Sequence, residues 1–137
     1  DYRGKQHALI VFVRGDWCPT CHIMLRTYER NKDKFAEKNI VILAIGPDPA
    51  GVNLDMVQRL GIDYKVLSDE KNEAAKAYGM MFQKNNPLTE YGTGIPLPAA
   101  FLVDMNGILI YTSDPKTPGE ILSPEKIFPI VESLKVV

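Results

Sequence analysis

The fold is decided by residues 8–21, which read Ala8-Leu9-Ile10-Val11-Phe12-Val13-Arg14-Gly15-Asp16-Trp17-Cys18-Pro19-Thr20-Cys21. The first part, residues 8–13, is an unbroken apolar run rich in valine and isoleucine, which predicts a buried strand. Pro19 fits the beginning of a helix, because proline is well tolerated in the first helical turn. We therefore expect Cys18 at a strand-to-helix junction, where unpaired amide groups and the positive end of the helix dipole favour an anion.

Cys18 and Cys21 are the two cysteines of the chain, and they lie three positions apart. A thiol at a helix N-terminus has its pKa lowered from about 8.5 into the range of roughly 3.5–7.5, which makes it reactive near neutral pH. One turn later, Cys21 is close enough to form a disulfide with Cys18. The spacing therefore predicts a redox-active dithiol rather than a pair of inert, buried structural thiols.

The composition is that of an ordinary globular protein. With 137 residues, of which 45% are hydrophobic, the chain fits a single domain over 1–137 that needs no disulfide staples. The first strand begins close to Asp1, which favours a domain excised from a longer chain. Two cysteines with His7 and His22 are too few, and wrongly spaced, for a zinc site, so we expect no metal or other cofactor.

Charge and hydropathy limit the partners. The net charge of −1, with acidic and basic residues mixed, argues against nucleic acid. No stretch approaches the roughly 18 apolar residues of a membrane helix, and the start of the chain lacks a signal-peptide pattern, so we expect no membrane insertion. The compartment is weakly constrained, with a cytoplasmic location slightly favoured over a periplasmic or other extracytoplasmic one.

Further along the chain, the pattern alternates between helix and strand. Apolar positions recur at helical spacing over 19–38, and residues 40–45 are a second wholly apolar run. Two such strands joined by a helix form a βαβ unit with a parallel pair. A short helix over 52–60, a short apolar step at 66–67 and a helix over 70–78 are expected next, the last one capped by Ser68 or Asp69 and ended by Gly79.

The remainder predicts a loop, a hairpin and a helix. Residues 80–94 show no clear period and are expected to form a long loop. The apolar runs 99–103 and 108–112 flank an Asn-Gly pair, which is a strong signal for an antiparallel hairpin and makes the sheet mixed. A last helix is expected from Ser123 towards Leu134, in which Pro129 either causes a kink or marks the true beginning.

This order of elements, with Cys-x-x-Cys after the first strand, resembles the thioredoxin fold, a three-layer α/β/α arrangement around a mixed sheet. Residues 14–21 look like the active-site segment of the AhpC/TSA redoxins, the peroxiredoxin-like family, which shares features with the TlpA type of thiol-disulfide oxidoreductase. Residues 43–49, 67–79 and 98–104 are similar to further segments of that superfamily. The resemblance covers nearly the whole chain.

The resemblance implies a thiol-disulfide oxidoreductase in which Cys18 is the attacking thiol and Cys21 the resolving one. Its substrate would be a protein or small-molecule disulfide or dithiol, and its electron donor a thioredoxin-like protein. A peroxiredoxin-like thiol peroxidase, in which a hydroperoxide oxidises Cys18 to sulfenic acid, is the alternative. A redox-sensing module of a larger protein is a second alternative.

The resemblance also implies a cis bond between Leu97 and Pro98 that faces Cys18, with the Leu97 backbone available to a bound substrate. Pro96 is the competing candidate for this bond, since proline alone does not select a cis form. Tyr91 is a further candidate for lining the entrance to the site.

Five residues near the cysteines are candidates for substrate binding or tuning: Arg14, Asp16, Trp17, Pro19 and Thr20. Trp17 is either a packing residue or a substrate-facing one. Arg14 either stabilises a thiolate or peroxide or is a surface charge, and Asp16 is equally ambiguous. For His22 we favour a side chain that faces water over one that tunes Cys21.

Two departures from known patterns matter. Peroxiredoxins carry proline and then threonine or serine where this chain has Val11 and Gly15, and they keep an arginine near the later proline strand, whereas no arginine follows Arg59 here. Thioredoxin has a buried acid where this chain has Phe12. The proton acceptor for Cys21 is then Asp16, a water, or a residue that the sequence does not identify.

Overall fold

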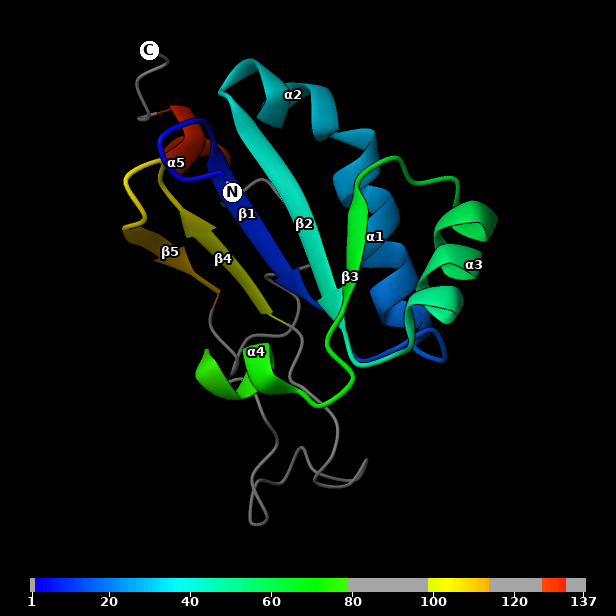
Figure 1. Ribbon diagram of the computed structural model, residues 1–137. Helices are drawn as coiled ribbons and strands as arrows, with labels where there is room; N and C mark the ends of the chain where they lie inside the picture. The colour runs from blue at the N-terminus through cyan, green and yellow to red at the C-terminus, as the bar shows by residue number, and fades with distance from the viewer. Residues whose placement is uncertain (1, 79–98, 114–126, 133–137) are drawn as a thin grey trace.

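The computed structural model describes residues 2–78, 99–113 and 127–132. Its centre is a five-stranded sheet in the order β3-β2-β1-β4-β5, with helices around it (Figure 1). β1, β2 and β3 run parallel, whereas β4 is antiparallel to β1 and β5 is antiparallel to β4. The strand bounds are β1 His7–Phe12, β2 Ile40–Gly46, β3 Lys65–Ser68, β4 Ala99–Val103 and β5 Leu109–Thr112. The predicted thioredoxin-like fold with a mixed sheet is therefore confirmed.

β1 lies in the middle of this sheet because it is apolar on both faces. Its Leu9 and Val11 are fully buried on one face, and Phe12, 1% exposed, packs on the other. A strand that is covered on both sides has to be apolar at successive positions rather than at alternate ones. β1 pairs with β2 on one side, and with β4 on the other.

Helices cover both faces of the sheet. Their bounds are α1 Pro19–Arg30, α2 Lys32–Glu37, α3 Ala50–Leu60, α4 Glu73–Ala77 and α5 Phe128–Glu132. Side chains of α1, α2 and α3 share one core cluster with residues next to and within α5, whereas α4 belongs to a second cluster on the opposite face. None of the helices in the described ranges has the length and apolar character to span a membrane.

The single helix expected over 19–38 is wrong, because the structure divides it at Asn31. The Asn31 amide nitrogen donates to the Tyr28 carbonyl at 3.2 Å, and its side chain donates to the Thr27 carbonyl at 2.8 Å. These bonds engage the last carbonyls of α1, which therefore ends here. The apolar spacing nevertheless runs on, since Phe35 of α2 is fully buried in the same cluster as Tyr28.

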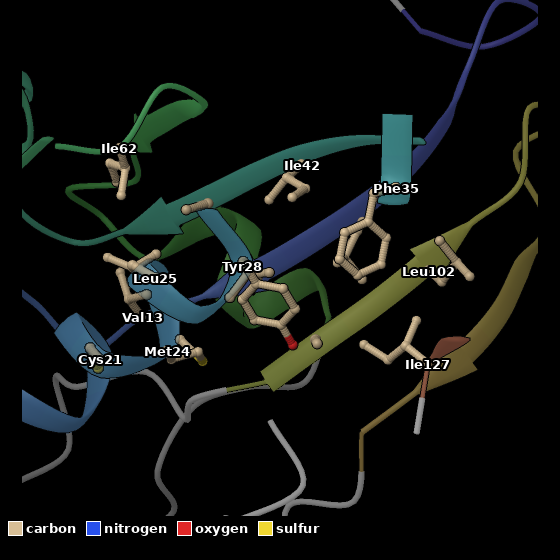
Figure 2. Close-up of a cluster of buried hydrophobic side chains, with 14 of the residues drawn as sticks. Val13, Cys21, Met24, Leu25, Tyr28, Phe35, Ile42, Ile62, Leu102 and Ile127 are labelled. Atoms are coloured by element: carbon tan, nitrogen blue, oxygen red, sulfur yellow. The ribbon is translucent and has the colours of Figure 1, made fainter. Parts of the chain in front are cut away.

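The larger core cluster lies between the sheet and α1. Figure 2 shows Met24, Leu25 and Tyr28 of α1 directed towards the strands, with Phe35 and Ile127 further along the same layer. The Phe35 ring centroid lies 6.1 Å from that of Tyr28 and 5.4 Å from that of Phe128. Full burial of such side chains contributes roughly 1.5–3 kcal/mol each. This layer holds α1 against the sheet.

The apolar step at 66–67 is the centre of a strand, β3, and α4 is shorter than the helix expected after it. The predicted N-cap at Ser68 or Asp69 is wrong, because α4 begins later and its N-cap residue is Asn72. The Asp69 carboxylate nevertheless accepts from the amide nitrogens of Ala74 and Ala75, both at 3.1 Å, and so satisfies the first turn from outside the helix. Ser68 donates its hydroxyl to the Asp48 carbonyl instead. Gly79, the predicted helix end, lies outside the described residues.

The predicted hairpin is confirmed, with β4 and β5 joined by a turn that includes Gly107 at φ 83°. The Asp104 carboxylate accepts from the amides of Asn106 and Ile108, both at 2.9 Å, which fixes the turn. Pro129 is the second residue of α5 and so lies at the beginning of the described helix. The expected loop over 80–94 and Ser123 lie outside the described residues.

Gly61 ends α3 in the left-handed conformation, with φ 68°, as the sequence predicts. A Cβ on Gly61 would meet nothing within 4 Å, so replacement carries only the backbone cost. We expect Gly61→Ala to lower the free energy of unfolding by about 1 kcal/mol, measured by urea denaturation. The matched control is Gly51→Ala in the same helix, which has equal space and no positive φ and should lose nothing. Equal losses in both variants would contradict this account.

Candidate active site

Cys18 is the N-cap residue of α1. Its backbone is extended, with φ −94° and ψ 104°, and its sulfur accepts a hydrogen bond from the Cys21 amide at 3.3 Å. Pro19 follows at the first helical position, where its missing N–H costs nothing. Cys18 therefore occupies the strand-to-helix junction that the sequence predicts, and its sulfur takes the place of a capping oxygen.

Cys21 faces the protein interior one turn later, and both cysteines are free thiols. Cys21 is 2% exposed and Cys18 is 4% exposed. Figure 2 places Cys21 at one end of the large core cluster, beside Met24. The Cys21 sulfur accepts a hydrogen bond from the Arg14 backbone amide at 3.4 Å. The two thiols differ, since Cys18 caps the helix and Cys21 is enclosed behind it.

The two thiols also differ in acidity. The hydrogen bond from the Cys21 thiol lowers the pKa of Cys18 to about 6, with further help from backbone amides and the Arg14 charge, against the opposing effect of burial. The same hydrogen bond and burial raise the pKa of Cys21 far above its ordinary value. Cys18 is thus a thiolate at neutral pH and Cys21 stays protonated, the division that an attacking and a resolving thiol require.

Gly15 shapes the loop before Cys18. Its φ is 149°, and a Cβ built on it would lie 2.7 Å from Nε1 of Trp17. The Gly15 carbonyl accepts from the Cys18 amide at 3.2 Å, which closes the turn. The departure from the peroxiredoxin pattern at this position therefore has a local cause: the loop takes a conformation that favours glycine, with the indole packed over it.

Asp16 is held in an ion pair with Arg59. Its carboxylate contacts Nη2 of Arg59 at 2.6 and 2.5 Å and Nε2 of His22 at 3.2 Å. The bonds from Arg59 and then His22 hold the pKa of Asp16 below its usual value, although burial opposes them. A carboxylate engaged in this way is a poor base, so the expectation that Asp16 accepts the proton of Cys21 is not supported.

The other candidates next to the cysteines take different positions. Trp17 is 51% exposed, while Pro19 and Thr20 are exposed in the first turn of α1. Arg14 is half-buried and acts on the dithiol through both its charge and its backbone amide. The expectation that His22 simply faces water is wrong, since its ring is half-buried against Asp16.

Arg59 and Asp48 were not identified from the sequence. Asp48, in the turn after β2, accepts from the Asp16 amide at 2.7 Å through its carboxylate. Arg59, in the last turn of α3, joins Asp16 and Asp55, the latter at 2.8 Å. The i, i+4 spacing of Asp55 and Arg59 is visible in the sequence, but the contact with Asp16 joins residues 43 positions apart and has no local signal.

Leu97 and Pro98, the predicted cis bond, lie outside the described residues, as do the competing Pro96 and Tyr91. Within the described ranges, no group of three or more His, Cys, Asp and Glu side chains is arranged to hold a metal ion.

Fold and site together define a thioredoxin-like domain with a dithiol at the N-terminus of α1. The AhpC/TSA family model matches residues 1–112, most of the chain. The chain belongs to the AhpC/TSA family, as the motifs around Cys18 implied.

Named relatives fall into two groups. The chain is 26% identical to thiol-disulfide oxidoreductase ResA of Bacillus thuringiensis over 111 residues, 80% of this chain and 55% of that relative. It is 28% identical to peroxiredoxin Bcp of Bacillus subtilis over 110 residues, 80% of this chain and 68% of that relative. The chain thus spans little more than half the length of the ResA proteins that it matches.

Among solved structures, peroxidoxin BcpB from Mycobacterium tuberculosis matches with a TM-score of 0.80 at 16% identity, over 95% of this chain and 80% of that one. The reduced 2-Cys peroxiredoxin of Plasmodium vivax matches with a TM-score of 0.78 at 23% identity, over 96% of this chain and 78% of that one. At these identities the likeness shows the shared fold.

Iodoacetamide should modify Cys18 of the reduced protein far ahead of Cys21. The rate should rise through pH about 6 and level off near pH 7, because the thiolate is the reacting form. A thiol of ordinary pKa would keep gaining rate to about pH 8.5. Mass spectrometry after timed quenching measures both sites.

The matched control is Cys21→Ala, which removes the hydrogen bond that lowers the pKa of Cys18, so the midpoint should move to higher pH. A wild-type midpoint near pH 8.5, or one that Cys21→Ala leaves unchanged, would contradict the assignment.

Gly15→Thr installs the residue type that peroxiredoxins carry at this position. We expect it to lower the free energy of unfolding by about 1–3 kcal/mol, because threonine is strained at φ 149° and its Cβ collides with Trp17. Urea denaturation of the reduced protein measures the loss. In a Trp17→Ala background the collision is gone and only backbone strain remains, so the loss should shrink without vanishing. No loss in either background would refute this account of Gly15.

Proposed function

We propose that the chain is a thiol-disulfide oxidoreductase, with Cys18 as the nucleophile and Cys21 as the resolving thiol. The observation that carries the proposal is the capping of α1 by the Cys18 sulfur, which accepts from the Cys21 amide at 3.3 Å. That arrangement stabilises a thiolate on Cys18 while keeping a protonated thiol one turn away.

The chemistry needs no group besides the two sulfurs. The Cys18 thiolate attacks one sulfur of a substrate disulfide, forming a mixed disulfide and releasing the other sulfur as a thiolate. Cys21 then loses its proton to the medium and attacks the Cys18 sulfur, which forms the Cys18–Cys21 disulfide and releases the second substrate thiolate. Two electrons pass from the dithiol to the substrate, and a thioredoxin-like donor returns them. The same steps run backwards to oxidise a client.

Features around Cys18 support another protein as the partner. Trp17 directly precedes the nucleophile and is 51% exposed. Ile23 on α1 follows Cys18 by five positions and is 56% exposed, so two exposed apolar side chains flank the cysteine in the chain. Aromatic side chains of this kind are suited to binding another protein. The exposed first turn of α1 adds Pro19 and Thr20 to this surface.

A thiol peroxidase is the second candidate, favoured by the relatives named peroxiredoxin. In that reaction the Cys18 thiolate takes the terminal oxygen of a hydroperoxide, giving sulfenic acid and an alcohol or water. Cys21 then condenses with it to a disulfide and water. Two residues argue against this candidate. The peroxiredoxin pattern has threonine or serine where this chain has Gly15, which has no hydroxyl, and proline where it has Val11. No arginine follows Arg59 in the chain.

Stopped-flow fluorescence separates the candidates, since Trp17 is the sole tryptophan and adjoins Cys18. Reduced protein is mixed with hydrogen peroxide or with bis(2-hydroxyethyl) disulfide, and each rate is compared with that of glutathione at equal thiolate concentration. We expect at least a tenfold advantage over glutathione for the disulfide and none for peroxide. A large advantage for peroxide alone would overturn the proposal in favour of the peroxidase.

Trapping gives an independent test. Cys21→Ser is expected to accumulate a mixed disulfide with the reagent at Cys18, because the resolving thiol is absent. The matched control, Cys18→Ser, should trap none, since burial keeps the pKa of Cys21 above its ordinary value and the thiol is a poor nucleophile. Trapping at Cys21 in that control would refute the assigned roles.

A further inference from the structure

The Cys21 sulfur lies against the backbone of Arg14. The Arg14 amide donates to this sulfur at 3.4 Å, across seven positions of the chain. Arg14 follows the end of β1 by two residues and is half-buried, while Cys21 is 2% exposed. The loop after β1 therefore places an N–H group of a cationic residue on the thiol that has to resolve the mixed disulfide.

Cys21 has to become a thiolate before it can attack Cys18, because the thiolate is the nucleophile. Of the described charged groups, those that act on the pKa of Cys21 are Cys18 and Arg14. The other charged groups of the loop and of the first turn of α1 bind one another or Arg59: Asp16 and His22. The means of forming the Cys21 thiolate therefore has to come from Arg14 rather than from a neighbouring carboxylate.

The influences on Cys21 change once a substrate is attached to Cys18. In the reduced protein the hydrogen bond with Cys18, burial and the Cys18 charge raise the pKa of Cys21, while the Arg14 amide and the Arg14 charge lower it. In the mixed disulfide Cys18 carries no charge, and its sulfur is a weaker acceptor. Burial then remains on one side and Arg14 on the other, so the balance moves towards the thiolate at the step that needs it.

We propose that Arg14 stabilises the Cys21 thiolate in the resolving step, through the amide that contacts its sulfur and through the positive charge of its side chain. The inference rests on the proposed function and deepens it, since it assigns the group that activates the resolving thiol. The Cys21 proton passes to the medium, and the thiolate attacks the Cys18 sulfur. The Cys18–Cys21 bond forms, the bond from Cys18 to the substrate sulfur breaks, and the substrate leaves as a thiolate with that electron pair.

Dithiobis(nitrobenzoate), an aromatic disulfide with a coloured thiolate, separates the two steps in a stopped-flow absorbance experiment. Attack by Cys18 releases one coloured thiolate at a rate that depends on the reagent concentration. Attack by Cys21 on the mixed disulfide releases the second at a rate that does not. At pH 8 the first phase is insensitive to small changes at Cys18, because its pKa is about 6. The second phase then reports on Cys21.

Three variants of Arg14 test the charge and the amide separately. Arg14→Gln removes the charge and keeps the amide, so the pKa of Cys21 in the mixed disulfide should rise by about one unit. Its thiolate fraction falls about tenfold, but the more basic thiolate attacks about threefold faster, so the second phase should slow about threefold. Arg14→Lys restores the charge and should recover most of the rate. Arg14→Pro also lacks the amide hydrogen and should be slower than Arg14→Gln.

A titration measures the same effect without any disulfide exchange. In Cys18→Ser, Cys21 is the sole thiol of the chain, so thiolate absorbance near 240 nm follows its pKa directly. Spectra of Cys18→Ser with Cys21→Ala are subtracted to remove the contribution of the tyrosines. Adding Arg14→Gln to Cys18→Ser should raise the midpoint by about one unit.

The matched control is Arg26→Gln. Arg26 is an exposed arginine of α1 that is not among the groups acting on the pKa of either cysteine, so its replacement should leave both phases and the midpoint unchanged. Urea denaturation checks that each variant folds. A merely structural role for Arg14 predicts that both phases slow together and that the midpoint of Cys21 stays in place. That pattern, or a lysine variant that behaves like glutamine, would overturn the proposal.

The two measurements separate this inference from the proposed function. A first phase no faster than that of glutathione, together with a midpoint that Arg14→Gln raises, would refute the proposed function and leave the role of Arg14 standing. A fast first phase together with an unchanged midpoint would refute the role of Arg14 alone.

Discussion

The capping of α1 by a sulfur atom is the interaction on which the site depends. A helix N-terminus leaves amide groups without partners, and a side-chain oxygen at the N-cap is a common way to satisfy one of them. Here the Cys18 sulfur accepts from the Cys21 amide. The same atom therefore caps the helix and is stabilised as a thiolate. β1 helps to place that atom, because the strand is buried on both faces at the centre of the sheet and ends at Phe12, where the loop to Cys18 begins.

The electrostatics of the site reflect a balance between opposing groups. The Cys21 hydrogen bond, backbone amides and the Arg14 charge favour the thiolate, whereas burial opposes it. Asp16 lies in the loop that presents the nucleophile, yet it is paired with Arg59 and His22. A carboxylate neutralised in this way contributes a structural contact without the full repulsion that a free one would exert.

The family membership is compatible with two reactions at the two sulfurs, disulfide exchange and peroxide reduction. The AhpC/TSA family model covers residues 1–112, and relatives include proteins named as peroxiredoxins and others named as thiol-disulfide oxidoreductases. What distinguishes this chain lies in Gly15, whose positive φ and close approach to Trp17 leave no space for the threonine or serine of the peroxiredoxin pattern. The conformation of this loop accounts for the missing hydroxyl.

The sequence by itself determined the dithiol, the strand-to-helix junction, the βαβ unit and the hairpin, since each depends on residues close together in the chain. Asn31 was harder to anticipate, because the apolar spacing continues across the point where its hydrogen bonds end α1. Only the tertiary structure decided that Asp16 is paired rather than available as a base, and that Arg59 and Asp48 belong to the site. Those contacts join residues 43 and 32 positions apart, and they exist because the sheet brings the turn after β2 and the helix α3 against the loop before α1. Local sequence patterns do not predict such a contact, because it arises from the packing of helices and strands that are distant in the chain.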